Sequence, residues 1–141
     1  MEHKAQEDYP HADLTRQVLD AAFRVSNTLG CGSLEKVYEN ALSVQLRDQG
    51  LAVAQRVPVR VQYLGQTVGE YCADMVVQGA VLVETKATEK DDPICVAQVL
   101  NYLRATKLPV GMLLNFGRPR LSYRRLAWRG SMPTCSEPEG C

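Results

Sequence analysis

Residues 71–87 read YCADMVVQGAVLVETKA, two apolar runs on either side of a Gln-Gly turn. These runs predict the two strands of a β-hairpin, but charged side chains interrupt them where a plain core hairpin would carry none: Asp74, Glu84 and Lys86. Because side chains alternate along a strand, Glu84 and Lys86 share one face of the second strand. Whether Asp74 lies on that face depends on the turn, so the functional interpretation includes a prediction about register.

Two turns are compatible with the hairpin. A three-residue loop over residues 77–79, with its glycine in the left-handed conformation, pairs Val76 with Ala80 and places Asp74 on the face of Glu84. A two-residue loop of Gln and Gly alone places the two carboxylates on opposite faces unless a bulge intervenes. The functional interpretation requires Asp74 and Glu84 on one face.

The bulk composition predicts a single soluble domain. The chain has 141 residues, 45% of them hydrophobic and 23% charged, enough to bury a core without staples. We expect a disordered segment over residues 1–12, one domain over residues 13–129 and a flexible tail over residues 130–141. A polar start without a signal peptide and five cysteines without a CxxC pair favour a cytoplasmic protein with reduced thiols, and no apolar stretch reaches membrane-spanning length.

The hydrophobic pattern predicts a mixed α/β sheet with helical cover. Asp13 and Ser33 are expected to cap two helices, and Asp92 a third that begins at Pro93. Three antiparallel strands precede this third helix, and Pro58 suggests either that the first of them lies at an edge or that a strand ends there. The remaining pattern, in chain order, predicts helices over 13–29 and 34–49, strands over 53–63 and in the hairpin, a helix to about 106, a buried strand over 109–116 and a last strand over 121–128.

Basic residues gather in the last third of the chain, although the formal net charge is zero. No Asp or Glu occurs between Pro93 and Ser136. A basic segment can meet phosphate while the total charge stays neutral. The candidate phosphate-binding residues are Arg118, Arg120, Arg124 and Arg125. A partner-binding or merely solvated edge is the alternative.

Two carboxylates on one sheet face with a lysine nearby suit metal-assisted hydrolysis of a phosphodiester. Asp74 and Glu84 would supply oxygen ligands to Mg²⁺ (or Mn²⁺), which is commonly held by one or two carboxylates and substrate phosphate. The Thr85 backbone carbonyl could complete the ligand set. Lys86 would position or deprotonate water, or stabilise the phosphate oxygens. The alternative is a charged, solvated hairpin face.

Glu35 is a further candidate because it falls within the apolar stripe of its predicted helix. That stripe consists of Leu34, Val37, Tyr38, Ala41, Leu42 and Leu46. A carboxylate among apolar residues is costly unless it is paired, protonated or bound to a metal. Glu35 could therefore be a metal ligand, or it could lie at the edge of the stripe or compensate the positive end of the helix.

Residues 32–38, GSLEKVY, match the GxxExxY motif that names a family of small, mostly bacterial proteins. The chain resembles that family from about Leu14 to Trp128. The resemblance extends to the PD-(D/E)xK nuclease superfamily, whose restriction-endonuclease-like core runs helix, three antiparallel strands, helix and further strand. Its signature falls on Asp74 and on residues 84–86, although Ala73 stands where the superfamily's name has proline.

Residues 98–102, QVLNY, look like the QxxxY motif of the RecB-like branch of that superfamily. The resemblance implies that Gln98 helps to orient the active site or DNA and that Tyr102 lies near the scissile strand. Packing on the surface of a helix is the alternative for both residues.

We therefore expect a Mg²⁺-dependent nuclease that acts on nucleic acid, most readily DNA. The alternative is a non-catalytic module that binds nucleic acid or protein on a nuclease-like fold. The complete set of Asp74, Glu84 and Lys86 favours the enzyme, because a fold kept only for binding has no need of it. The sequence leaves open a homodimer or a subunit of a larger repair or defence complex.

Overall fold

The computed structural model describes residues 10–128 of the chain. Within them the core order is helix, helix, three strands, helix and two strands. Residues 1–9 and 129–141 lie outside the described part, so the expected division at residues 12 and 130 stays a prediction.

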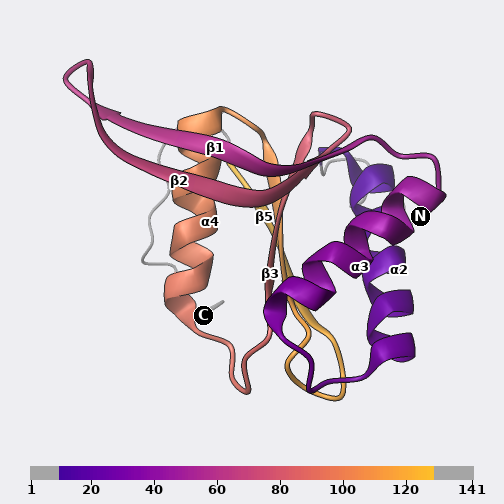
Figure 1. Cartoon of the computed structure of the whole chain (residues 1–141). Helices are drawn as coiled ribbons and strands as arrows, with labels where there is room; N and C mark the ends of the chain where they lie inside the picture. Colours follow the sequence, from indigo (N-terminus) through magenta and orange to yellow (C-terminus); the bar gives the residue numbers. More distant parts are fainter. Residues whose placement is uncertain (1–9, 129–141) are drawn as a thin grey trace, which may run out of the picture.

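The centre of the fold is one five-stranded mixed sheet (Figure 1). Its strands lie side by side in chain order: β1 (Val53–Tyr63), β2 (Gln66–Val77), β3 (Val81–Lys86), β4 (Val110–Asn115) and β5 (Ser122–Ala127). All neighbours are antiparallel except β3 and β4, which are parallel. The predicted mixed α/β fold, with three consecutive antiparallel strands, is confirmed.

Helices cover both faces of this sheet (Figure 1). One face packs against α2 (Ala12–Leu29) and α3 (Glu35–Asp48), and the other packs against α4 (Pro93–Thr106), which connects β3 to β4. Each face has its own apolar cluster, so the central strands are buried on both sides. Every residue of β4 is buried, as its apolar sequence predicts.

The helix starts agree only in part with the sequence. Asp92 caps α4 as predicted, since its side chain accepts a backbone N–H at 3.0 Å. The capping roles expected for Asp13 and Ser33 are wrong. Helix α2 begins one residue before Asp13 and is preceded by His11 in the left-handed conformation, and α3 is preceded by Leu34. Neither His11 nor Leu34 makes a side-chain capping hydrogen bond.

The hairpin of β1 and β2 extends well beyond the rest of the sheet (Figure 1). Its outer strand β1 is the sheet edge, which explains why it tolerates Pro58. Between residues 10 and 128, no helix combines the length and the apolar character that crossing a membrane requires.

Candidate active site

The turn between β2 and β3 sets the register of the two carboxylates. Gln78 and Gly79 both have positive φ, and the Ala80 N–H donates to the Val77 carbonyl, as in a type I′ turn. Ala80 is then an extra residue, because Val77 pairs with Val81. The predicted pairing of Val76 with Ala80 is wrong.

This register brings the carboxylates together all the same. Val77 pairs with Val81, Val76 with Leu82 and Met75 with Val83, so the next position sets Asp74 opposite Glu84. The turn therefore follows the two-residue alternative with a bulge, and the bulge restores the relation that the functional interpretation requires.

The hairpin of β1 and β2 changes direction at Asp74. The pairing of β1 with β2 skips Arg56 and Asp74, and Arg56 has φ 58°. Before this point Gln55 bonds to Glu39 on α3, whereas after it Val57 packs in the cluster under α4. The hairpin thus passes from one helical layer to the other at Asp74.

At this point the ladder of backbone hydrogen bonds between β2 and β3 ends. Beyond it, side chains of one strand bond to the backbone of the other. The Asp74 N–H donates to Glu84 Oε1 at 2.8 Å. In return, Asp74 Oδ2 accepts the N–H and the hydroxyl of Thr85, each at 2.8 Å. Asp74 is only 7% exposed and Glu84 5%, so each buried carboxylate is held by the other strand's backbone.

The nearby charge of Asp74 disfavours a negative charge on Glu84. Burial, followed by the charge of Asp74, raises the pKa of Glu84 to about 7, although the Asp74 N–H and Lys86 oppose the shift. A cation bound between the two carboxylates would offset both the burial and the repulsion, and so would lower the pKa of Glu84.

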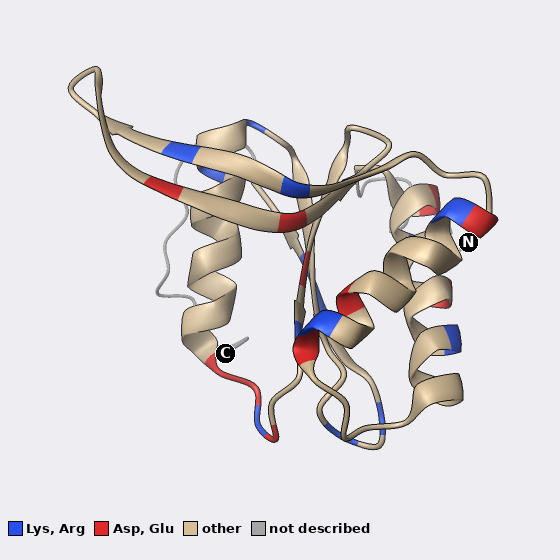
Figure 2. Cartoon of the chain, in the orientation of Figure 1, with Lys and Arg blue, Asp and Glu red and all other residues tan. Residues whose placement is uncertain are grey.

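Lys86 lies two residues beyond Glu84 and is half-buried. The Phe116 N–H fixes its backbone by donating to the Lys86 carbonyl at 2.8 Å. Its ammonium acts electrostatically on both Glu84 and Glu35. Figure 2 shows acidic and basic segments where the start of α3 passes β3.

The motif around Glu35 is built by Tyr38. Fully buried, Tyr38 stacks on Phe116 with ring centroids 4.8 Å apart. Its hydroxyl donates to the Gly30 carbonyl at 2.6 Å and accepts the Ser33 N–H at 3.1 Å. The hydrogen bond from the Ser33 N–H thus closes the loop between α2 and α3. Helix α3 begins after this loop.

Glu35 itself is exposed at the first turn of α3. Partial burial of its carboxyl group is the largest cause that raises its pKa, with Asp74 adding to the shift and Lys86 opposing it. Glu35 therefore lies within the electrostatic field of the carboxylate pair. The structure does not assemble Glu35, Asp74 and Glu84 into one ligand set, since within residues 10–128 no three His, Cys, Asp or Glu side chains form a group that could hold a metal ion.

Helix α4 turns one face toward the carboxylates. Burial, then Glu84, Tyr71 and Asp74, raises the pKa of Tyr102 to about 12, so its hydroxyl stays protonated. Burial raises the pKa of the Cys95 thiol; the charge of Lys86 opposes this shift, and the charge of Glu84 adds to it. Gln98, half-buried, lies three residues after Cys95 and four before Tyr102, and thus on the same helical face.

Comparison with protein families decides the class of this fold. A family model described as the PD-(D/E)XK nuclease superfamily matches residues 12–126. The chain belongs to the PD-(D/E)XK nuclease superfamily. This superfamily match covers both helical layers and almost all of the sheet. Among curated proteins, none is similar enough to the chain to match it.

Solved structures with a similar backbone are distant in sequence. The alkaline exonuclease LHK-Exo from Laribacter hongkongensis aligns at 11% identity and TM-score 0.49, over 83% of this chain and 70% of its own. LHK-Exo in complex with dAMP aligns at 12% identity and TM-score 0.42, over 75% of each chain. SSO0001 aligns at 16% identity and TM-score 0.49, over 65% of this chain, which spans 48% of that structure.

Nucleases of this superfamily generally use divalent metal ions, and the carboxylate pair fits such an ion. Asp74 Oδ1 and Glu84 Oε2 have no hydrogen bond within the described residues. The Thr85 carbonyl points to the same side as its N–H, toward Asp74, because both groups of a strand residue face one neighbour. Two carboxylates and one carbonyl form the hard oxygen set that Mg²⁺ and Mn²⁺ prefer.

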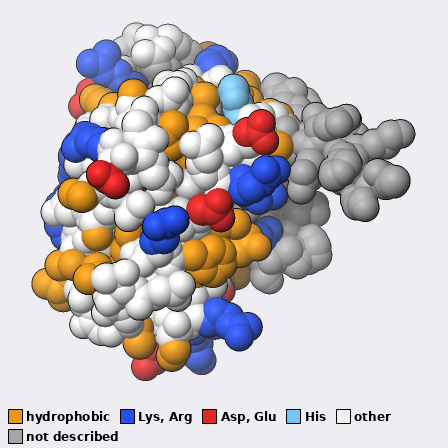
Figure 3. Space-filling view, turned by 90° about the vertical axis from the view of Figure 1, so that its right-hand side faces the viewer, with side chains coloured by type: hydrophobic (Ala, Val, Ile, Leu, Met, Phe, Trp, Pro, Cys, Tyr) orange, Lys and Arg blue, Asp and Glu red, His pale blue; other side chains and the backbone are white. Residues whose placement is uncertain are grey.

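The four candidate arginines do not form one surface. Arg118 is bound to Asp91 at 2.8 Å. Arg124 pairs with Leu113 and Arg125 with Met112, which belong to opposite apolar clusters, so the two arginines lie on opposite faces of β5. The face formed by α2 and α3 carries interspersed charges of both signs (Figure 3). Strand alternation separates what the sequence places side by side.

Three features of the site were missed from the sequence. Tyr71 lies against Tyr102 with ring centroids 5.9 Å apart. Cys95 and Lys86 line one cavity. Asp91 and Asn115 bond at 2.8 Å across 24 residues, which ties the loop after Lys86 to the end of β4. The period-two alternation could have indicated Tyr71, but nothing local in the sequence predicts the other two contacts.

Proposed function

We propose that this protein is a divalent-metal-dependent nuclease that hydrolyses phosphodiester bonds in DNA, and that it belongs to the GxxExxY family and the RecB-like branch of its superfamily. One observation carries the proposal. Asp74 and Glu84 are buried opposite each other with one free oxygen each, beside Lys86. Two acids in such a place are costly unless a cation joins them.

The roles follow from what each group can do. Asp74, Glu84 and the Thr85 carbonyl hold the ion. When bound, a divalent ion supplies Lewis-acid stabilisation of phosphoryl oxygens and makes water more acidic. Lys86 offers a positive charge to the phosphate oxygens and a proton donor or acceptor beside the attacking water. Tyr102, protonated, donates a hydrogen bond on the α4 side, where Gln98 orients the strand.

Glu35 and the arginines act at the margin of this site. Glu35 adds negative charge near Lys86 and Asp74, which strengthens the attraction for a cation at the mouth of the site. Arg124, on the α4 face of β5, is the arginine best placed to meet the substrate's phosphates. Arg120 and Arg125 extend the positive charge around the edge of β5.

A cleavage assay tests the proposal. Single-stranded, duplex and branched DNA and RNA are incubated with the protein and Mg²⁺ or Mn²⁺, with EDTA as the blank. Asp74→Asn, Glu84→Gln and Lys86→Met are each expected to lower the cleavage rate by at least about a hundredfold. The matched controls, Glu70→Gln and Lys90→Met, change exposed residues of the same types outside the site and are expected to cut normally.

The outcomes separate enzyme from binding module. Cleavage that survives all three substitutions contradicts the proposed mechanism. Salt-sensitive DNA binding without cleavage of any substrate favours the non-catalytic module instead.

A further inference from the structure

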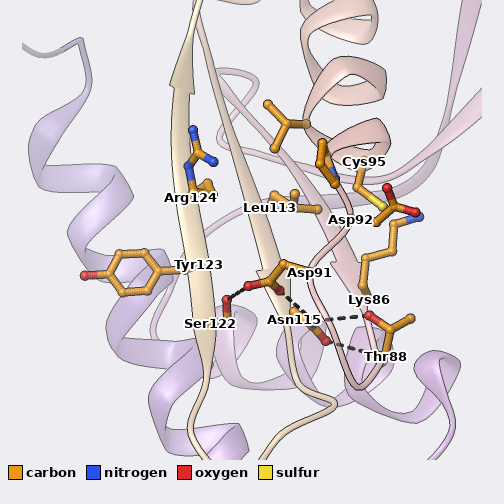
Figure 4. A pocket seen from close by; sticks show the side chains of 12 residues that line it. Lys86, Thr88, Asp91, Asp92, Cys95, Leu113, Asn115, Ser122, Tyr123 and Arg124 are labelled. Carbon is orange, nitrogen blue, oxygen red and sulfur yellow. Dashed lines mark hydrogen bonds between the residues drawn. The ribbon is translucent and has the colours of Figure 1, made fainter. Parts of the chain in front are cut away.

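A cavity of about 360 Å³ opens directly beside Lys86 (Figure 4). It lies between the first turn of α4 and the strands β4 and β5, and Lys86 is the residue that it shares with the carboxylate site. Pockets that bind small molecules span about 300–1,000 Å³, so this one has room for a single nucleoside-sized group.

One wall of the cavity is apolar and comes from two elements. Pro93 and Val96 contribute it from α4, and Leu113 from β4, with the Cys95 thiol beside them (Figure 4). Flat heteroaromatic rings pack well against such side chains, as bases do when a protein takes them out of the stack.

The opposite wall is polar and already bonded. Asp91 Oδ1 accepts the Asn115 amide at 2.8 Å, and Asp91 Oδ2 accepts the Ser122 hydroxyl at 2.7 Å and Arg118 at 2.8 Å. Asn115 Oδ1 accepts the N–H groups of Thr88 and Gly117. These bonds hold the wall in place before any ligand arrives, which lowers the cost of binding.

The charges of the lining disfavour a phosphate inside it. Asp91 and Asp92 both border the cavity, and their carboxylates would repel an anion. Lys86 and Arg124 also border it. This arrangement suits a neutral base within the cavity and phosphates of the same strand at Lys86 and Arg124.

We propose that the cavity receives one unpaired nucleoside of the strand being cut, next to the phosphodiester at Lys86. The proposal rests on the proposed nuclease function and defines its substrate further. A paired base cannot enter, so the strand at the cut is single-stranded or frayed.

Cys95 allows a direct test that needs no cleavage. The full chain is prepared with Cys31, Cys72, Cys135 and Cys141 changed to Ser, and alkylation of Cys95 is timed in EDTA. A short oligothymidylate is expected to slow alkylation severalfold, and a strand of equal length made of abasic residues is expected not to. Equal protection by both strands, or by neither, overturns the proposal.

Filling the cavity gives the second measurement. Cys95→Phe is expected to lower the ratio of the Mg²⁺-dependent cutting rate on oligothymidylate to that on an abasic strand about tenfold, because base binding is lost. The matched control is Cys31→Phe, which changes an exposed cysteine outside the cavity. If the wild type cuts DNA but Cys95→Phe matches this control, the cavity proposal fails and the nuclease function stands. A wild type that neither cuts DNA nor shows oligothymidylate protection of Cys95 overturns both.

Discussion

The Asp74 side chain accepts the hydrogen bond from Thr85 that a backbone carbonyl of the neighbouring strand would otherwise accept. Its Oδ2 accepts both the Thr85 N–H and the Thr85 hydroxyl at 2.8 Å, at the point where the ladder between β2 and β3 ends. Both residues are buried, so these bonds are shielded from water. The Asp74 carboxylate thus continues the hydrogen bonding of the sheet through Oδ2, while Oδ1 is left to bind a cation.

Replacement of Thr85 by Val tests the structural half of this arrangement. The substitution keeps the shape and the backbone N–H but removes the hydroxyl that Asp74 accepts. Since hydrogen bonds to charged groups contribute about 1.5–3 kcal/mol, we expect the free energy of unfolding to fall by about 2 kcal/mol. Urea denaturation measures it. Thr67→Val, at an exposed position, is the control and should change little.

Replacement of Glu84 by Gln should alter how stability depends on pH without metal. The pKa of Glu84 rises from 4.5 to about 7 on folding, so its contribution is fully present below 4.5 and is lost as pH rises through 7. That loss is on the order of 3 kcal/mol. In EDTA we expect Glu84→Gln to unfold at higher temperature than wild type near pH 8, with the difference shrinking near pH 5. Parallel melting temperatures across that range would contradict this.

Metal binding should compete with protonation of Glu84. Because Mn²⁺ needs the ionised carboxylate, its affinity is expected to weaken by up to about tenfold for each pH unit below 7. Calorimetric titration with Mn²⁺ at several pH values measures the effect. Glu89→Gln, in the exposed loop after β3, should leave the pH dependence unchanged. A flat profile would place the ion elsewhere.

Gly117 is expected to reject any side chain. A Cβ there would lie 2.3 Å from the Thr88 backbone nitrogen and oxygen, in the loop that leads away from Lys86. Gly117→Ala should therefore lower the free energy of unfolding by about 2 kcal/mol or more and slow cleavage. Gly69→Ala is the control, because its Cβ would only touch the Tyr71 ring at 3.5 Å. A fully stable, fully active Gly117→Ala would argue against the close approach.

Much of the fold was predictable because its signals are local. The unbroken apolar run of β4, the Asp92-Pro93 start of α4 and the edge proline of β1 each reflect a preference of the backbone itself. The register was harder. Glycine permits more than one turn, and only packing of the whole sheet selects the bulge at Ala80.

The surroundings of the carboxylates depend on contacts between distant residues. Arg56, a residue type that does not favour positive φ, turns the hairpin at Asp74. The cavity wall joins Asp91 to residues of the β4–β5 connection, including Arg118. Neither periodicity nor spacing reports such contacts, and so the sequence identified the charged residues but not the cavity beside them.

The early end of the β2–β3 ladder changes what the three signature residues mean. Asp74 and Glu84 accept hydrogen bonds from the backbone of the opposite strand, so both carboxylates have a structural role beside any part in cutting. The Lys86 ammonium makes no hydrogen bond or close ion pair within residues 10–128, and the sheet does not need it. Of the three signature residues, Lys86 is therefore the one whose side chain has no structural bond to account for it.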